Sequence, residues 1–379
     1  MTREIQTKDR LSVDGLANNI QEIQRSTRMT SFFKRILFKK LKGLKTGELT
    51  IIDGSEIHVF GILKSEFKAT LTVSSQEFYV FLGSGGTNGA AEAFTAGYWS
   101  ADNLVELIQI IIRNKKTMEG LESGLARLTN PITKIIHRLR QNTLKGSKSN
   151  ILAHYDLSND FYKLWLDSTM TYSSGIFLNK KSSMLDASVE KLDRLCRKLN
   201  LNSSDHVLEI GTGWGSFATH AAKNYGCKVT TTTISDNQFN YVAELISKEN
   251  LDNKITLLNK DYRELEGVFD KIVSIEMIEA VGEKNLKTYF STISKNLNQG
   301  GVAAIQAIII QDKLYDSYRK NQDFIQKYIF PGGFLPSFGA IKNHVSKNGL
   351  ELAEHNSYGL HYSKTLQEWR ENFIKSWDI

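Results

Sequence analysis

The chain of 379 residues has room for two domains, each long enough to bury a hydrophobic core. Hydrophobic residues make up 41% of it and charged residues 23%, which is typical of a globular protein and excludes a disordered chain. The net charge of +7 favours an anionic partner, either nucleic acid or an anionic membrane surface. The two cysteines, Cys196 and Cys227, form neither a disulfide framework nor a metal site and suit a reducing cytoplasm.

Residues 1–44 are a polar and basic N-terminal segment without the apolar core of a signal peptide. Within it, residues 32–45 alternate apolar side chains with lysine and arginine. On a helix this pattern gives an apolar face bordered by cations. Such a helix suits either an anionic lipid surface or packing against its own domain, and both interpretations stay open.

Residues 45–145 are expected to form a small α+β accessory domain that docks on lipid. Runs rich in β-forming residues predict strands in this domain, and glycines predict a loop over 84–91. A helix is expected over 91–116, with Ser100 or Asp102 as the N-cap before its apolar run. The predicted strands lie at 48–54, 55–61, 69–75 and 77–83.

The polar stretch 144–150 marks the expected domain boundary, and from residue 146 onward strands alternate with helices. This alternation predicts an α/β domain with a parallel sheet that helices cover on both faces. In such sheets, ligands bind beyond the carboxyl ends of the strands. The predicted strands begin at residues 206, 228, 254, 269 and 301.

The segment 207–218, VLEIGTGWGSFA, places a glycine turn between a buried strand and a helix. A dinucleotide site would require a third glycine at Ser216 and an acid at the end of the next strand, and the chain has neither. The spacing E-x-G-x-G-x-G, which starts at Glu209, instead resembles motif I of class I S-adenosylmethionine-dependent methyltransferases. Polar residues, among them Glu276 and Glu279, follow the other strands and are expected at the same edge of the sheet.

Five blocks of sequence, in order, resemble the cyclopropane-fatty-acyl-phospholipid synthase family, which is related to the mycolic acid cyclopropane synthases. The resemblance extends from about Phe94 to the end of the chain. It implies a Rossmann-like methyltransferase fold and transfer of a methylene group from S-adenosylmethionine to the cis double bond of a phospholipid acyl chain. In the family, a bound bicarbonate ion deprotonates the carbocation intermediate. The blocks are HYDLSNDFYKLWLDSTMTYSSGIF, EIGTGWG, TISDNQ, DYRELEGVFDKIVSIEMIEAVG and YIFPGGFLPS.

The resemblance also implies two sets of site residues. The expected cofactor-binding residues are Tyr172, Ser173, Glu209, Gly211, Gly213, Trp214, Gly215, Thr233, Gln238 and Tyr262. The expected catalytic and bicarbonate-binding residues are Glu279, Tyr362, Gln306, Ser174 and Ile308. Ser174 stands where many members have cysteine, and Gln306 and Ala280 stand where members have histidine.

Four aromatic residues, Phe161, Tyr162, Trp165 and Phe177, suit an apolar entrance for an acyl chain, although simple core packing accounts for any single one of them. The chain ends at FIKSWDI, whereas the family continues for several tens of residues. The family's last strands and part of the pocket wall are therefore expected to be absent. Whether the chain is a shorter natural variant, a deliberately trimmed form or a truncated protein of doubtful activity stays open.

The sequence therefore predicts a cytoplasmic enzyme that is peripheral at the inner face of the membrane and acts on phospholipid acyl chains. Nucleic acid is not an expected partner, because no N-P-P-Y-type catalytic motif is found. The alternatives are methyl- or methylene-branching of acyl chains and a catalytically impaired lipid-binding variant. A homodimer is left open.

Overall fold

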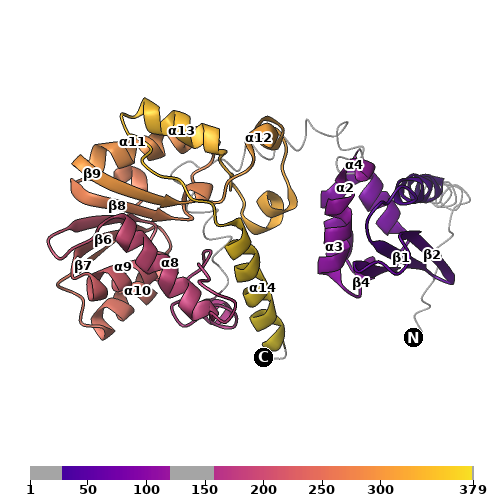
Figure 1. The fold of residues 1–379 in the computed structure, drawn as a ribbon, viewed down its shortest axis with the longest axis horizontal. Coiled ribbons are helices and arrows are strands. Elements are labelled where there is room, and N and C mark those ends of the chain that lie inside the picture. The colour runs from indigo at the N-terminus through magenta and orange to yellow at the C-terminus, as the bar shows by residue number, and fades with distance from the viewer. Residues whose placement is uncertain (1–27, 120–157, 378–379) are drawn as a thin grey trace, which may run out of the picture. The chain divides into compact units, whose positions relative to one another are not determined.

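In the computed structural model, residues 28–119 and 158–377 are described, and the chain divides into two compact units, 1–135 and 136–379 (Figure 1). The boundary expected at 144–150 lies outside the described residues. No described helix is long and apolar enough to cross a membrane.

The N-terminal unit combines a four-stranded mixed sheet with helices, which is the predicted α+β arrangement. The strand order is β2-β1-β3-β4, and β1 pairs antiparallel with β2 and parallel with β3. Residues 28–41 form a further helix. The elements are β1 (Glu48–Asp53), β2 (Glu56–Gly61), β3 (Lys68–Val73), α2 (Glu77–Thr95), β4 (Trp99–Ala101), α3 (Leu104–Arg113) and α4 (Lys115–Met118).

The apolar face of the helix at 28–41 is buried in the core of its own unit. Phe33, Leu37 and Leu41 are at most 6% exposed and belong to one cluster with residues of the sheet and of α3. The structure thus selects packing within the domain over an apolar face that lies on lipid. Arg35 and Lys39 of this helix and Lys42, in the turn directly after it, form an exposed cationic stripe at positions i, i+4 and i+7.

Helix α2 corrects two expectations, because it contains both the strand predicted at 77–83 and the loop predicted at 84–91. The apolar run buries Phe78 and Tyr79 on one side of the helix, and periodicity alone could not separate a buried helix from a strand. The glycines of α2 serve close packing: a Cβ at Gly83 would overlap the Phe33 ring. At Gly86 the backbone has φ +59 and the helix kinks.

The helix predicted over 91–116 is also interrupted, since β4 separates α2 from α3. The N-cap of α3 is Asn103, whose side chain accepts a hydrogen bond from the Glu106 N–H at 3.1 Å. Neither Ser100 nor Asp102 is the cap. Asp102 instead accepts a hydrogen bond from the Thr70 N–H of β3 at 2.7 Å, which ties the start of α3 to the sheet.

The C-terminal unit contains a five-stranded parallel sheet in the order β7-β6-β5-β8-β9, as in class I methyltransferases. The strand order reverses direction between β5 and β8, which places a crevice at their carboxyl ends. The strands are β5 (His206–Ile210), β6 (Lys228–Thr233), β7 (Ile255–Asn259), β8 (Phe269–Ile275) and β9 (Leu297–Gln306). The predicted parallel sheet is confirmed.

Helices cover both faces of this sheet (Figure 1). Val207 of β5 packs into a core with α8, α9 and α10, whereas the next residue, Leu208, packs into a second core with α11 and α13. The helices are α7 (Asn159–Lys163), α8 (Met184–Lys198), α9 (Ser216–Asn224), α10 (Asp236–Lys248), α11 (Leu286–Asn296), α12 (Asp312–Tyr318), α13 (Phe338–Lys347) and α14 (Gly359–Lys375). Short helical turns are η1 (Tyr262–Glu264), η2 (Ile278–Ala280), η3 (Glu283–Asn285) and η4 (Ile325–Ile329).

Helix α14 lies against the segment that precedes α8. Thr365 accepts a hydrogen bond from the Gly175 N–H at 3.1 Å, and His361 Nδ1 accepts one from the Phe177 N–H at 3.1 Å. Trp369 is buried against Trp165, with ring centroids 5.4 Å apart. These contacts hold α14 against residues that lie nearly two hundred positions earlier in the chain.

We expect Leu41→Ala to destabilise the N-terminal unit by about 2–5 kcal/mol, because it removes a fully buried side chain. Hydrogen exchange followed by mass spectrometry checks this unit by unit, with faster exchange expected in β1, β3 and α3. The exposed neighbour Lys42→Ala is the control and should change exchange little. Unaltered exchange in Leu41→Ala would contradict the core position of this helix.

Candidate active site

The turn between β5 and α9 is open to space at Gly213. Gly211, Gly213 and Gly215 all have left-handed φ values, of +97, +55 and +84, which glycine adopts without strain. A Cβ at Gly213 would meet nothing within 4 Å. No side chain among the described residues caps the N-terminus of α9, so its first N–H groups are available to a ligand. The turn therefore fits the polar end of a bound nucleoside or amino-acid ligand.

Three expected cofactor residues flank this turn. Tyr172 and Trp214 belong to an aromatic cluster, with Tyr162 between them at centroid distances of 5.6 and 4.7 Å. Ser173 is buried, and its Oγ accepts a hydrogen bond from Lys191 Nζ at 2.9 Å. Tyr172 and Ser173 are thus fixed in place before any ligand binds.

Thr233, Gln238 and Tyr262 follow the next two strands. The Thr233 hydroxyl donates to Gln238 Oε1 at 2.8 Å, which fixes the start of α10 against the end of β6. Tyr262 is buried, and its OH has no hydrogen-bond partner among the described residues. Burial raises the pKa of Tyr262 to about 12. A buried hydroxyl of this kind, at the carboxyl end of the sheet, suits a polar ligand.

Glu209 lies inside the sheet and is 2% exposed. It accepts a hydrogen bond from the Thr231 hydroxyl of β6 at 2.6 Å. Burial raises its pKa to about 8, against the opposing effects of Thr231 and of the Lys191 charge. In this structure Glu209 joins β5 to β6 below the turn.

A polar cluster lies at the carboxyl ends of β8 and β9. Glu276 accepts hydrogen bonds from the Ser174 N–H at 2.9 Å, from Gln306 Nε2 at 2.9 Å and from the Tyr362 hydroxyl at 3.2 Å. Gln306 Nε2 also lies 3.2 Å from the Ser174 carbonyl oxygen, which it can reach as a donor. Three expected site residues thus converge on Glu276, a residue to which the sequence analysis assigned no catalytic role.

Glu279 lies three residues further on and is held differently. Its Oε1 accepts a hydrogen bond from the Ile308 N–H, while its Oε2 is buried without a partner among the described residues. Burial, and then the charge of Glu276, raise the pKa of Glu279 to about 8. At neutral pH this carboxyl group is therefore protonated and can donate a hydrogen bond.

Lys191 of α8 is the second functional residue that the sequence analysis missed. It is 1% exposed, and burial lowers its pKa to about 8, against the opposing charges of Glu276, Glu209 and Asp167. A signal was present, because Lys191 occupies the buried face of α8 between Ala187 and Leu195, where the helical period requires an apolar residue. A buried lysine with several carboxylates nearby is a functional-site signal.

The expected aromatic entrance is largely core. Tyr162, Trp165 and Phe177 are all at most 9% exposed and pack in one cluster with Trp369, whereas Phe161 is partly buried at its edge. For these three residues the packing interpretation is correct. Residues 154–157 of the same sequence block lie outside the described residues.

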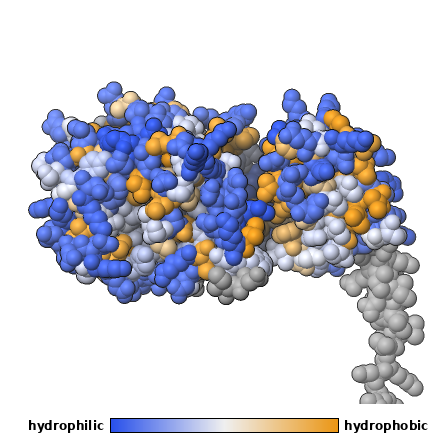
Figure 2. Space-filling view, turned by 60° about the horizontal axis from the view of Figure 1, so that its bottom comes forward, coloured by the Kyte–Doolittle hydropathy of each residue, from blue (hydrophilic) through white to orange (hydrophobic). Residues whose placement is uncertain are grey.

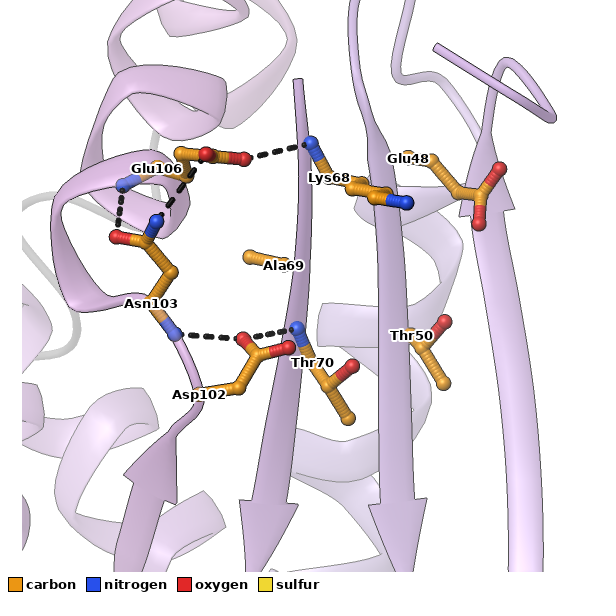
Figure 3. Close-up of a pocket in the computed structure, with 8 residues that line it drawn as sticks. All are labelled: Glu48, Thr50, Lys68, Ala69, Thr70, Asp102, Asn103 and Glu106. Carbon is orange, nitrogen blue, oxygen red and sulfur yellow. Dashed lines mark hydrogen bonds between the residues drawn. The ribbon is translucent and has the colours of Figure 1, made fainter. Parts of the chain in front are cut away.

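A polar depression in the N-terminal unit carries no comparable chemistry (Figure 3). It lies between β1, β3 and the start of α3, and its carboxylates are engaged by the backbone: Glu106 accepts from the Lys68 N–H at 3.0 Å. Among the described residues, no cluster of three or more histidine, cysteine or acidic side chains could hold a metal.

The strand order, the glycine turn and the polar cluster define a class I S-adenosylmethionine-dependent methyltransferase. The family model "Mycolic acid cyclopropane synthetase" matches residues 142–379. The chain belongs to this family, as the sequence predicted.

Two curated relatives and one solved structure illustrate the similarity. The tuberculostearic acid methyltransferase UfaA1 of Mycobacterium tuberculosis is 34% identical over 78% of this chain and 71% of its own length. The cyclopropane-fatty-acyl-phospholipid synthase of Escherichia coli is 33% identical over 82% and 78%. The structure of the mycolic acid cyclopropane synthase CmaA1 complexed with SAH and CTAB is 30% identical, with a TM-score of 0.57, over 60% of this chain and 83% of that one.

We expect the raised pKa of Glu279 to make stability depend on pH. Above pH 4.5 the unfolded chain loses this proton while the folded protein keeps it up to about pH 8. The free energy of unfolding should therefore fall by up to about 1.4 kcal/mol per pH unit across this window because of this group. Urea unfolding at several pH values should show that Glu279→Gln lacks this part of the slope; parallel curves would contradict the prediction.

Proposed function

We propose that the protein transfers a methylene group from S-adenosylmethionine to the cis double bond of an unsaturated phospholipid acyl chain, which forms a cyclopropane ring. The observation that carries the proposal is the convergence of Ser174, Gln306 and Tyr362 on the half-buried carboxylate of Glu276 beside the glycine turn. Family membership and the name of the Escherichia coli relative support the same reaction.

The residues around the turn fit the cofactor. When bound, S-adenosylmethionine supplies an electrophilic methyl group. The glycine turn and the uncapped start of α9 would hold its polar end, and Thr233, Gln238 and Tyr262 would flank its nucleoside. Tyr172 and Ser173, fixed by the aromatic cluster and by Lys191, would set the direction of approach.

The polar cluster would act on the acyl chain. An alkene is a weak nucleophile, so the site must exclude water and hold the double bond close to the methyl group. The buried aromatic cluster beside the site excludes water and offers ring faces to a developing cation. A proton must then leave the new methyl group before a ring can close. The half-buried carboxylate of Glu276 is an acceptor within the polar cluster, whereas Glu279 already carries a proton.

A second product is supported by the Mycobacterium tuberculosis relative, whose name describes a tuberculostearic acid methyltransferase. Loss of a proton from a neighbouring chain carbon, in place of the methyl group, would leave a methyl-branched alkene. A 1,2-hydride shift to the cationic carbon, followed by loss of a methyl proton, would leave a methylene-branched chain. The site supports both outcomes, because the position of the acyl chain decides which proton lies near the acceptor.

Purified protein incubated with S-adenosylmethionine and vesicles of cis-monounsaturated phospholipid should yield fatty acids heavier by one CH₂ group. Mass spectrometry detects the gain, and dimethyl disulfide, which adds to alkenes, separates a ring from a branched alkene. Gly211→Val is the inactive control, because its Cβ would lie 2.9 Å from Met277 Cγ at a left-handed φ. A wild-type protein that releases no methylated lipid would refute the proposal.

We further propose that the N-terminal unit docks on an anionic phospholipid surface. The exposed stripe of Arg35, Lys39 and Lys42 lies on the helix that contacts β2, where Phe38 packs on His58 with ring centroids 4.7 Å apart. β2 and the turn after it expose Ile57, Val59, Ile62 and Leu63. Figure 2 shows hydrophobic residues among hydrophilic ones on the surface of this unit. Exposed cations and exposed apolar side chains on one unit suit a lipid interface.

Replacing Arg35, Lys39 and Lys42 together by alanine should weaken binding to phosphatidylglycerol vesicles by as much as about 100-fold, since each cation near such a surface contributes about 1 kcal/mol. Vesicle sedimentation at low and high salt measures this, and the difference should shrink at high salt. The control replaces three exposed lysines of the other unit, Lys248, Lys287 and Lys295. Equal weakening by both variants would argue against a docking surface on this helix.

A further inference from the structure

The donors expected to bind bicarbonate are engaged by two carboxylates of the chain itself. The Ser174 N–H, Gln306 Nε2 and the Tyr362 hydroxyl all reach Glu276, and the Ile308 N–H reaches Glu279. A carboxylate and a bicarbonate ion share a planar, negatively charged group of oxygens. Glu276 thus makes the hydrogen bonds that the exogenous ion would need, and the cluster as it stands does not fit bicarbonate.

The backbone of Glu276 is held in a conformation that favours this position. Its φ is +46, in the left-handed region that a residue with a long side chain adopts at a cost of about 1–3 kcal/mol. Its N–H donates to the Gln306 carbonyl at 2.8 Å, which fixes the end of β8 against the end of β9. Strain of this kind persists where the surrounding structure requires it, and here it directs a carboxylate into the polar cluster.

The charged groups around Glu276 stabilise its own carboxylate but do not stabilise an additional anion such as bicarbonate. Lys191 is the buried cation that faces it from α8, and Glu279 and the Tyr362 hydroxyl face it from the other packed elements. The donors and Lys191 oppose the effect of burial, which raises the pKa of Glu276. Glu279 lacks such donors on Oε2 and is the protonated member of the pair. A further anion would meet uncompensated negative charge.

We propose that Glu276 is the catalytic base of this enzyme and replaces an exogenous bicarbonate ion. The inference rests on the proposed function, since it names the proton acceptor of that reaction. In the step, a C–H bond of the transferred methyl group breaks and its proton moves to a Glu276 oxygen. The electron pair of that bond forms the new carbon–carbon bond to the cationic carbon and closes the ring. The proton then leaves to solvent, and no oxidant or reductant is needed.

The first test compares the wild-type protein in bicarbonate-depleted buffer and in buffer with added bicarbonate. We expect the rate of methylated-lipid formation to agree within about two-fold between the two buffers. Activity that appears only with bicarbonate would overturn the inference and leave the proposed function standing. No methylated lipid in either buffer would overturn both.

The second test uses Glu276→Gly, which removes the carboxylate, frees its donors and relieves the left-handed strain. Without bicarbonate, turnover should fall by about 100-fold or more, the usual contribution of a general base. Added bicarbonate should restore at least a tenth of the lost rate, because the ion can then occupy the vacated donors. Glu276→Gln, which keeps the volume of the side chain, should be slow and should not be rescued.

The matched control is Asn250→Gly, at another left-handed position, with φ +55, that is exposed at the end of α10. It makes the same backbone change away from the site and should show wild-type turnover without bicarbonate dependence. A readout that does not need turnover is the ¹³C resonance of labelled bicarbonate, which should broaden with Glu276→Gly and not with the wild-type protein. Broadening with the wild-type protein, or full activity of Glu276→Gly without bicarbonate, would overturn the inference.

Discussion

The buried ammonium group of Lys191 is the interaction on which the catalytic unit depends. It donates a hydrogen bond to Ser173, and its charge opposes the effect of burial on the pKa of Glu209 and of the half-buried Glu276. A buried ion without a partner costs several kcal/mol, so these groups remain inside only as a set. The set joins α8, β5 and the end of β8, and it therefore couples the cofactor side of the crevice to the polar cluster.

The architecture of the C-terminal unit could be predicted because its strands are buried runs separated by amphipathic helices, and parallel sheets leave few other arrangements. The secondary structure of the N-terminal unit was harder to predict from the sequence. The run at 77–83 has the composition of a strand, and the glycines after it suggest a loop, yet both form α2. The reason is tertiary: the ring of Phe33 requires a residue without a side chain at Gly83, which no local propensity reveals.

At the site, the family resemblance predicted that Gln306, Tyr362 and Ser174 lie together. In the structure Gln306 donates to the Ser174 carbonyl, and Gln306 and Tyr362 both donate to Glu276. The resemblance assigned Glu279 to the catalytic set and no role to Glu276, although both follow the same strand. The distinction depends on the left-handed backbone at Glu276, which turns that side chain toward three donors. Backbone handedness at a non-glycine residue leaves no mark in composition or spacing.

The left-handed position of Glu276 also has a genetic consequence. Glycine adopts this conformation without strain, and the codons for glutamate and glycine differ by a single base. A lineage can therefore gain or lose this carboxylate in one nucleotide step without passing through a misfolded protein. The source of negative charge in the crevice can thus be exchanged during evolution while the scaffold around it stays unchanged.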